Sequence, residues 1–307
     1  MSRFRTNHSL RGLVKQFAIT CFVLGALAAA SARAKEPAPF HIQAHRGAGD
    51  AFPENTLESF EWSWNHGVTP ESDLRTTKDG TIVCFHDPNF KRVPYKIDDA
   101  LKESSIEKLP LAEVEKLDVG SFRAPQFAGQ HIPTLASVFA EMHGHPERLL
   151  YIDIKAVKLD QLAALVCEHK VEQQIIFTSE HPRLIRDWKK ILPESHTLLW
   201  NRGTEEQLAK KMADLRKTKF AGITHLQIHV QVGDLSSDEP FMPSSAFLRK
   251  LGEELKSHGI VFQTFSAECK DQKVYERLLA LGAQSFATDY PEVTLAAVKS
   301  FREKTQQ

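Results

Sequence analysis

Cysteine is scarce in this chain of 307 residues, which has only Cys21, Cys84, Cys167 and Cys269. The last three cannot all pair with one another within one chain, and a domain of this length folds without a disulfide framework. Cys84 lies in an apolar run and Cys167 in an expected helix. We therefore interpret both as small buried hydrophobic residues.

The sequence also lacks internal repeats, low-complexity tracts and a glycine-rich turn after an early strand. These absences exclude a repeat array and a disordered chain, and they count against a dinucleotide-binding fold. Hydrophobic residues make up 42% and charged residues 25% of the chain. This balance is typical of an ordinary globular protein.

The N-terminal segment differs from the rest of the chain. An apolar run at 17–30 precedes Ala32 and Ala34, the small residues that a signal peptidase needs. Before the run comes a basic start with Arg3, Arg5, Arg11 and Lys15. The run is shorter than the roughly 20 residues of a membrane span. We predict that 1–34 is a signal peptide cleaved after Ala34 and that the protein is exported, periplasmic or secreted, in a bacterium. An uncleaved membrane anchor is the alternative.

Removal of the basic leader changes the charge of the chain. Residues 1–34 hold five basic and no acidic residues, which leaves 34 basic and 39 acidic residues, a net charge of −5. A mildly acidic protein is poorly suited to hold a polyanion along an extended track. We therefore expect no nucleic-acid partner. Because cleavage also removes the apolar run, we expect no stable membrane insertion afterwards.

From residue 35 onward, short apolar runs alternate with amphipathic stretches. The runs expected to form strands are 40–45, 68–74, 81–85, 149–154, 174–178, 197–200, 222–228, 260–265 and 285–288. Helices are expected from Thr56 to Asn65, after Thr134, and at 159–169, 183–192, 205–216, 244–257, 272–281 and 293–301. About eight strand–helix units favour an α/β fold, a (β/α)₈ TIM barrel, in one domain at 35–307. A doubly wound open sheet is the alternative.

Residues 87–133 interrupt this alternation. They contain Pro88, Pro94, Pro110, Pro125 and Pro133. We interpret this segment as a small insertion between the strand that ends near His86 and the helix that opens near Thr134.

Four polar clusters follow or end expected strands. They are H-R-G at 45–47, E-S-D at 71–73, F-H-D at 85–87 and D-I-K at 153–155. The carboxyl ends of the strands form the active-site face of a barrel, so these clusters are expected to converge.

The acids Glu71 and Asp73 are two residues apart on one strand and therefore point to the same face. Two carboxylates on one face repel each other unless a cation lies between them, and oxygen ligands suit Ca²⁺ or Mg²⁺. A pair of solvated surface acids is the alternative for this motif taken alone.

Of the 14 histidines, His45 and His86 stand out because each lies at a strand end beside a charged residue. Two imidazoles can act as a general base and a general acid. Arg46 could hold a phosphate through two hydrogen bonds, and Lys155 could add a second positive charge.

Longer motifs connect these clusters. They read A-H-R-G at 44–47, P-E-N-T-L-E-S-F at 53–60, G-V-T-P-E-S-D-L-R at 67–75, F-H-D-P at 85–88, I-E-K-L at 106–109, G-Q-H-I-P-T-L at 129–135, Y-I-D-I-K at 151–155 and A-T-D-Y-P at 287–291. Together they resemble the signature of the glycerophosphodiester phosphodiesterase family over nearly all of the chain beyond the leader.

The resemblance implies a (β/α)₈ barrel with a small insertion. It also implies a small-molecule phosphodiester substrate and metal-dependent hydrolysis of glycerophosphodiesters to glycerol 3-phosphate and an alcohol. The residue roles that it implies are catalysis by His45 and His86, phosphate contact by Arg46, and binding of Ca²⁺ or Mg²⁺ by Glu71 and Asp73. It also places Glu54 in the site, as a metal ligand or as an orienting group.

Two positions depart from the family pattern. Asp153 stands where the family usually has a glutamate as third metal ligand, although the related phospholipase D toxins have an aspartate there. Gln263 and Thr264 stand where the family often carries an aromatic residue. These changes bear on the substrate pocket more than on the chemistry.

Other functions stay open from the sequence. A phospholipase D-like activity on lysolipids or sphingolipids would need an apolar groove, which Phe90, Tyr95, Phe122 and Phe127 of the insertion could supply. A non-catalytic barrel that binds phosphodiesters or a protein partner, and a purely structural barrel, are further alternatives.

Overall fold

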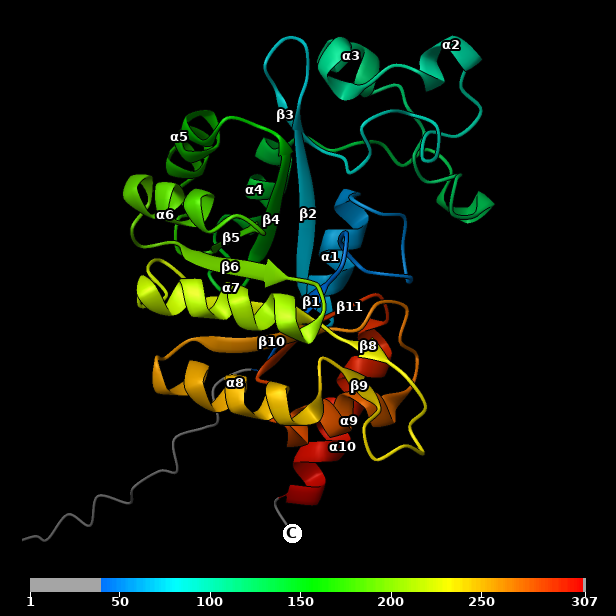
Figure 1. The fold of residues 1–307 in the computed structure, drawn as a ribbon. Coiled ribbons are helices and arrows are strands. Elements are labelled where there is room, and N and C mark those ends of the chain that lie inside the picture. Colours follow the sequence, from blue (N-terminus) through cyan, green and yellow to red (C-terminus); the bar gives the residue numbers. More distant parts are fainter. Residues whose placement is uncertain (1–39, 306–307) are drawn as a thin grey trace, which may run out of the picture. The chain divides into compact units, whose positions relative to one another are not determined.

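The computed structural model describes residues 40–305, in which eight parallel strands form a closed ring. In ring order the strands are β1 (His41–Ala44), β2 (Thr69–Thr76), β4 (Leu150–Ala156), β5 (Ile175–Ser179), β6 (His196–Asn201), β7 (His225–His229), β10 (Val261–Phe265) and β11 (Ser285–Thr288). Because β1 pairs with both β11 and β2, the sheet closes on itself. The prediction of a TIM barrel is thus confirmed (Figure 1).

A helix follows each parallel strand along the chain. These helices are α1 (Leu57–Asn65), α4 (Leu135–Met142), α5 (Leu159–His169), α6 (Pro182–Ile191), α7 (Glu205–Lys217), α8 (Ser245–Ser257), α9 (Gln272–Ala280) and α10 (Pro291–Thr305). The side chains of Thr56, Thr134 and Ser244 each accept a backbone hydrogen bond at the start of α1, α4 and α8. Such N-caps satisfy orphan amide groups and fix where each helix begins.

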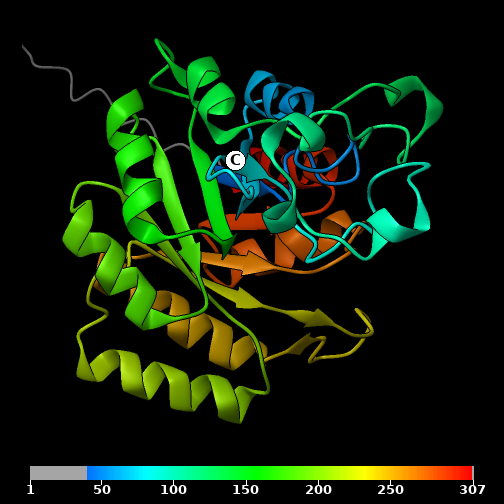
Figure 2. The same cartoon turned by 90° about the horizontal axis from the view of Figure 1, so that it is seen from above.

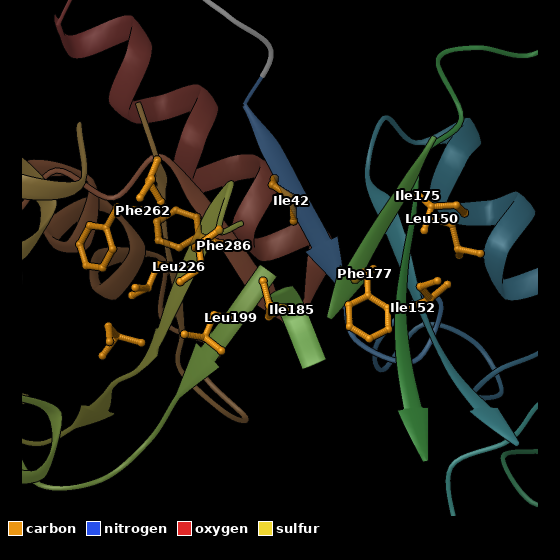
Figure 3. Close-up of a cluster of buried hydrophobic side chains, with 14 of the residues drawn as sticks. Ile42, Leu150, Ile152, Ile175, Phe177, Ile185, Leu199, Leu226, Phe262 and Phe286 are labelled. Carbon is orange, nitrogen blue, oxygen red and sulfur yellow. The ribbon is translucent and has the colours of Figure 1, made fainter. Parts of the chain in front are cut away.

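The main core lies between the ring of strands and the helices. Ile42 on β1, Ile152 on β4 and Phe177 on β5 are buried in the same cluster as Ile185 of α6 (Figure 3). Each of these side chains is almost fully removed from water. Burial of such side chains supplies the main driving force that holds helices on a sheet.

One expected strand lies outside the ring. β3 (Ile82–Cys84) runs antiparallel to the outer part of β2. Only five residues, 77–81, connect the two strands, and a parallel connection needs a dozen or more. The turn closes through a hydrogen bond from Thr77 to Thr81, with Gly80 in the left-handed region at φ 93°. His86 therefore follows the second strand of a hairpin.

The segment between β3 and α4 forms the expected insertion. It contains α2 (Asp99–Lys102), η1 (Ile106–Lys108), α3 (Leu111–Val114) and η2 (Pro125–Phe127). Its buried residues, with Val83 of β3 and Phe85 just after that strand, make a second hydrophobic cluster separate from the main core. Figures 1 and 2 both show this segment on the side of the barrel away from α5 to α7.

Three further findings complete the fold. A short hairpin, β8 (Gln231–Val232) with β9 (Phe241–Met242), follows β7 and was not predicted. The prediction that Cys167 is buried is wrong, because α5 turns Val166 toward the core and leaves the next residue exposed.

Among residues 40–305, no helix is long and apolar enough to cross a membrane. The predicted leader at 1–34 lies outside the described residues.

Candidate active site

A tight turn after β1 begins the site. Arg46 and Gly47 both have positive φ, 53° and 105°, and a Cβ added to Gly47 would collide with the side chain of Ser59. Only glycine fits without displacing α1. The turn aims the backbone N–H of Arg46 at Glu71 on β2, with a distance of 2.8 Å to Oε2.

Three acids from two neighbouring strands form a cluster. Glu71 and Asp73 share one face of β2, and the parallel register pairs Asp73 with Asp153 of β4. One carboxylate oxygen from each of the three lies within 4.8 Å of the others. Asn55, at φ 54°, fixes Asp73 through two hydrogen bonds of 2.9 Å, one to its carboxylate and one from its backbone N–H.

Two cations approach the acids: Arg46 Nε lies 3.9 Å from Asp73 Oδ2, and the ammonium group of Lys155 lies within the cluster. It lies 2.9 Å from Asp153 and 3.1 Å from Asp73. Burial and the neighbouring Asp73 raise the pKa of Glu71 to about 8, and burial also raises the pKa of Asp153. Burial opposes the charged form of Lys155, but Asp73 and Asp153 outweigh it and raise the pKa of the lysine.

Such a set of buried oxygen donors suits a hard divalent cation. Two cations do not balance three carboxylates, and burial together with the charge of Asp73 raises the pKa of Glu71. Oxygen ligands of this kind are those that Ca²⁺ and Mg²⁺ prefer. Glu71, Asp73 and Asp153 could therefore hold a metal ion.

Each of the two histidines has a carboxylate partner. Nδ1 of His45 lies 2.7 Å from Asp289, which directly follows β11, and Nδ1 of His86 lies 2.7 Å from Asp87. Burial would lower the pKa of His45, but the hydrogen bond to Asp289 and the charge of Glu71 outweigh it and raise this pKa. In both rings Nδ1–H donates to the acid, so Nε2 is left for other contacts.

A network of ion pairs joins the barrel to the insertion. Arg46 contacts Glu54 at 3.2 Å and donates from its other terminal nitrogen to Nε2 of His86 at 3.0 Å. Arg92 of the insertion contacts both Glu54, at 2.6 Å, and Asp87, at 2.8 Å. The carboxylate on His86 is thus itself held by the insertion.

Two hollows meet at this site. A cavity of about 260 Å³ within the mouth of the barrel is lined by both histidines, the three acids and Lys155. A neighbouring cleft of about 490 Å³ runs between the barrel and the insertion. His45 and Phe265 line both hollows, so the cleft reaches the same imidazole as the cavity.

An aromatic wall forms one side of the cavity. Phe265 packs against His45, with ring centroids 5.5 Å apart, and meets His229 nearly at a right angle at 5.1 Å. His229 stacks on Trp200 at 5.4 Å, and the guanidinium of Arg202 lies 5.6 Å from the Trp200 ring. The aromatic wall therefore extends from His45 to the guanidinium group of Arg202.

The structure brings together most of the residues singled out in the sequence. The members that line the cavity are His45, His86, Glu71, Asp73, Asp153 and Lys155. Arg46 and Glu54 line the adjoining cleft, and Glu54 pairs with arginines instead of joining the acidic cluster. Glu54 thus lies where an orienting group would, apart from the three acids.

Sequence reasoning missed several contributors. Asp289 and His229 each lie at the end of a barrel strand, as the recognised clusters do, and that position was the available signal. The partnership of Arg92 with Glu54 and Asp87 had no such signal, because it depends on how the insertion folds back.

Together, the barrel and its site define an enzyme with two histidines beside a buried acidic cluster. Residues 45–293 match the model of the Glycerophosphoryl diester phosphodiesterase family, and the chain belongs to that family. It is an enzyme of this class, as the motifs implied. A glycerophosphodiester phosphodiesterase of Caldanaerobacter subterraneus subsp. tengcongensis is 28% identical over 266 residues, covering 84% of this chain and 97% of the relative.

Other relatives agree in sequence and fold. A glycerophosphodiester phosphodiesterase of Bacillus subtilis is 25% identical, covering 94% of this chain and 97% of the relative. A solved glycerophosphodiester phosphodiesterase of Agrobacterium tumefaciens has a TM-score of 0.64 at 19% identity and covers 83% of this chain and 99% of its own. A phosphodiesterase of Oleispira antarctica has a TM-score of 0.64 at 22% identity, covering 84% and 96%. The structural likenesses support the same barrel fold.

Proposed function

We propose that His45 and His86 are the acid–base pair with which this enzyme hydrolyses glycerophosphodiesters to glycerol 3-phosphate and an alcohol. The observation that carries the proposal is that each imidazole has a carboxylate on Nδ1 and lines the cavity that also contains the acidic cluster. A positioned general acid or base typically contributes about 10²–10⁴-fold to the rate.

The hydrogen bonds favour different roles for the two histidines. An arginine can only donate, so the contact from Arg46 requires an unprotonated Nε2 on His86. His86 is then the base that removes a proton from the attacking hydroxyl, either of water or of the substrate itself. His45 is the acid that protonates the leaving alkoxide as the phosphorus–oxygen bond to it breaks. His86 gains the proton that the nucleophile loses.

The remaining residues would hold the phosphate. Arg46 donates to His86, and Lys155 lines the same cavity as both histidines. Glu71, Asp73 and Asp153 would bind Ca²⁺ or Mg²⁺. A bound divalent cation neutralises charge on the non-bridging phosphate oxygens. Glu54 orients Arg46 through their ion pair. The Oleispira antarctica neighbour was solved with the product sn-glycerol-3-phosphate, which supports the same product class here.

The test measures glycerol 3-phosphate release by residues 35–307 from glycerophosphocholine and glycerophosphoethanolamine, with Ca²⁺, with Mg²⁺ and with EDTA. We expect release with at least one cation and none with EDTA, and loss of release in His45→Ala. The exposed His258, far along the chain in sequence, supplies the matched control His258→Ala. Equal release with and without EDTA would refute the role of the acidic cluster.

A lysophospholipase D activity is the second candidate. The exposed aromatic ring of Phe122 lines the cleft next to His45, with Phe52 and Tyr290 also in its lining. A human relative named lysophospholipase D GDPD1 is 27% identical, covering 82% of this chain and 83% of the relative. Hydrolysis of lysophosphatidylcholine vesicles that exceeds hydrolysis of glycerophosphocholine, and that falls in Phe122→Ser, would favour this candidate.

We also propose that the protein is exported after cleavage of residues 1–34. The basic start, the apolar run at 17–30 and the small residues Ala32 and Ala34 support this. Expression of the full chain in a bacterial host, followed by fractionation and N-terminal sequencing, should give a periplasmic or secreted protein that begins at Lys35. A full-length protein that remains in the membrane fraction would contradict the proposal.

A further inference from the structure

A buried chain of hydrogen bonds crosses the interior of the barrel below the cavity. It starts at the backbone carbonyl of His41, to which Ser285 Oγ donates at 2.7 Å. Gln263 Nε2 lies 2.8 Å from that hydroxyl, and Gln227 Nε2 lies 2.5 Å from Gln263 Oε1. The chain ends at His229, whose Nε2 lies 3.1 Å from Gln227 Oε1.

In every hydrogen bond of this buried series, the donor and the acceptor can be assigned. A backbone carbonyl can only accept, so the hydroxyl of Ser285 must donate its single hydrogen to the carbonyl of His41. The same hydroxyl can then only accept from Gln263. Gln263 therefore uses its amide N–H there and presents its oxygen to Gln227. Gln227 in turn donates its N–H and presents its oxygen to His229. The imidazole must then donate from Nε2, which leaves Nδ1 unprotonated in the neutral ring.

Because the two glutamines are buried, reversing the direction of these hydrogen bonds would cost free energy. Gln227 is 4% exposed and Gln263 is fully buried, so each flipped amide would leave polar groups unpaired. Gln263 Nε2 also lies 3.3 Å from the hydroxyl of Tyr151, which accepts a second bond from the same amide group. Burial and the positive charge of Arg202 lower the pKa of His229 to about 4, which keeps its ring neutral at neutral pH.

The ring of His229 is held in one orientation at the cavity. Trp200 stacks on one face with an interplanar angle of 27°, and Phe265 meets the ring at 79°. Within residues 40–305, Nδ1 of His229 has no hydrogen-bond partner, yet it is not among the buried unpaired atoms. Since His229 lines the cavity, its Nδ1 remains accessible to a molecule bound there.

We propose that His229 is a specificity-determining residue, a fixed hydrogen-bond acceptor for a hydroxyl group on the polyol arm of the phosphodiester. The inference rests on the proposed function. It adds that the barrel cavity selects substrates with a free hydroxyl group on the polyol arm. Gln227, Gln263 and Ser285 act as positioning residues, because they determine which imidazole nitrogen carries the proton. Gln263 is also the position at which the family resemblance led us to expect an aromatic residue, which could not form this relay.

The kinetic test compares glycerophosphocholine with two analogues that each lack one of the two free glycerol hydroxyls. For each analogue, the ratio of kcat/KM for the parent substrate to kcat/KM for the analogue measures the preference for that hydroxyl. We expect wild type to favour the parent by about threefold to tenfold over at least one analogue, the effect of one net hydrogen bond. His229→Phe should bring this ratio close to one, and Gln263→Met should reduce it.

The matched control lies on the same strand as Gln263. Thr264 is buried, but its hydroxyl has no partner in the described part of the chain, so Thr264→Val removes a polar group without touching the relay. Its ratios should equal those of wild type. A ratio that is the same in His229→Phe and wild type for both analogues would overturn the proposal, as would a wild type with no preference.

A second measurement does not depend on turnover. Nitrogen-15 NMR of the imidazole of His229 distinguishes a ring protonated at Nε2 from one protonated at Nδ1. We expect the Nε2–H form in wild type and a mixture of both forms in Gln263→Met. The Nδ1–H form in wild type would refute the relay even if hydrolysis occurs. Absence of all hydrolysis with the Nε2–H form present would instead count against the proposed function alone.

Discussion

At the scale of single residues, carboxylates beside the two histidines are as informative as the histidines themselves. Asp289 lies 2.7 Å from His45 and is most of the chain away in sequence, whereas Asp87 is the next residue after His86. The two acids thus reach equivalent ring nitrogens from unrelated parts of the chain. Their shared effect is to orient each imidazole through Nδ1, and Asp289 also raises the pKa of His45.

The asparagine variant of Asp289 tests this role. Asp289→Asn keeps the size of the side chain but removes the charge that raises the pKa of His45. We expect kcat to fall by a large part of the about 10²–10⁴-fold that one acid–base group contributes. We also expect the pKa of His45, followed by NMR titration of the metal-free protein, to fall. A lower kcat with an unchanged titration would show that Asp289 acts on the fold instead.

Residue chemistry was predictable where it was carried by a local motif. Glu71 and Asp73 share a strand face in any β-strand, so their convergence followed from the sequence. The pairing of His45 with Asp289 depends on closure of the barrel between β1 and β11. His229 was missed because its neutral acceptor role depends on buried glutamines that carry no charge and belong to no recognised motif.

At the scale of elements, the hydrophobic packing of the insertion holds Arg92 in place at the active site. Phe90 is fully buried in the small cluster and meets Phe85 at 5.5 Å, and two residues later Arg92 contacts both Glu54 and Asp87. The cluster is separate from the main core. Loosening it should therefore disturb Arg92 without unfolding the barrel.

Phe90→Ala tests this coupling. Truncation of a buried phenylalanine typically costs about 3–5 kcal/mol. We expect this cost to appear as faster hydrogen exchange across 87–133, with protection of the barrel strands retained and with reduced activity. Tyr95→Ala, which removes an exposed ring of the same segment, is the control and should leave the exchange nearly unchanged. Equal loss of protection in barrel and insertion would contradict separate cores.

Most helices and strands were predictable because the spacing of apolar residues and the helix-capping residues indicated the same bounds. The bounds expected for 159–169 and 285–288 are those of α5 and β11, and Thr134 caps α4 as expected. Direction was the weak point, because an apolar run does not tell whether a strand such as β3 pairs parallel or antiparallel. The hairpin β8–β9 was missed because strands of two residues have no detectable period.

At the scale of the whole molecule, the two ends of the barrel differ in their chemistry. The acids and the histidine pair line the cavity in the mouth of the barrel, while His225 is buried at the start of β7. Burial and the nearby His196 lower the pKa of His225 to about 4 from the ordinary value of 6.5. The buried ring is therefore neutral in the folded protein over most of the pH range.

This difference predicts acid destabilisation. Between pH 6.5 and pH 4 the unfolded chain protonates this imidazole but the folded chain does not, so the free energy of unfolding falls as pH falls. His225 alone accounts for a loss of up to about 3 kcal/mol over this window. The stability lost between pH 7 and pH 4.5, measured by urea unfolding, should be smaller in His225→Gln than in wild type. The exposed His258→Gln variant should match wild type, and equal losses in all three proteins would contradict the account.

The most direct test of the central claim is a set of four proteins: wild type, His45→Ala, His86→Ala and the double variant. Their kcat values for glycerophosphocholine would be measured at a saturating concentration of the activating cation. Groups that act as one acid–base unit are not additive. We expect each single variant to lose at least about 10²-fold and the double variant to be little worse than the poorer single variant. A kcat within about twofold of wild type in either single variant would contradict the assignment of His45 and His86 as the acid–base pair.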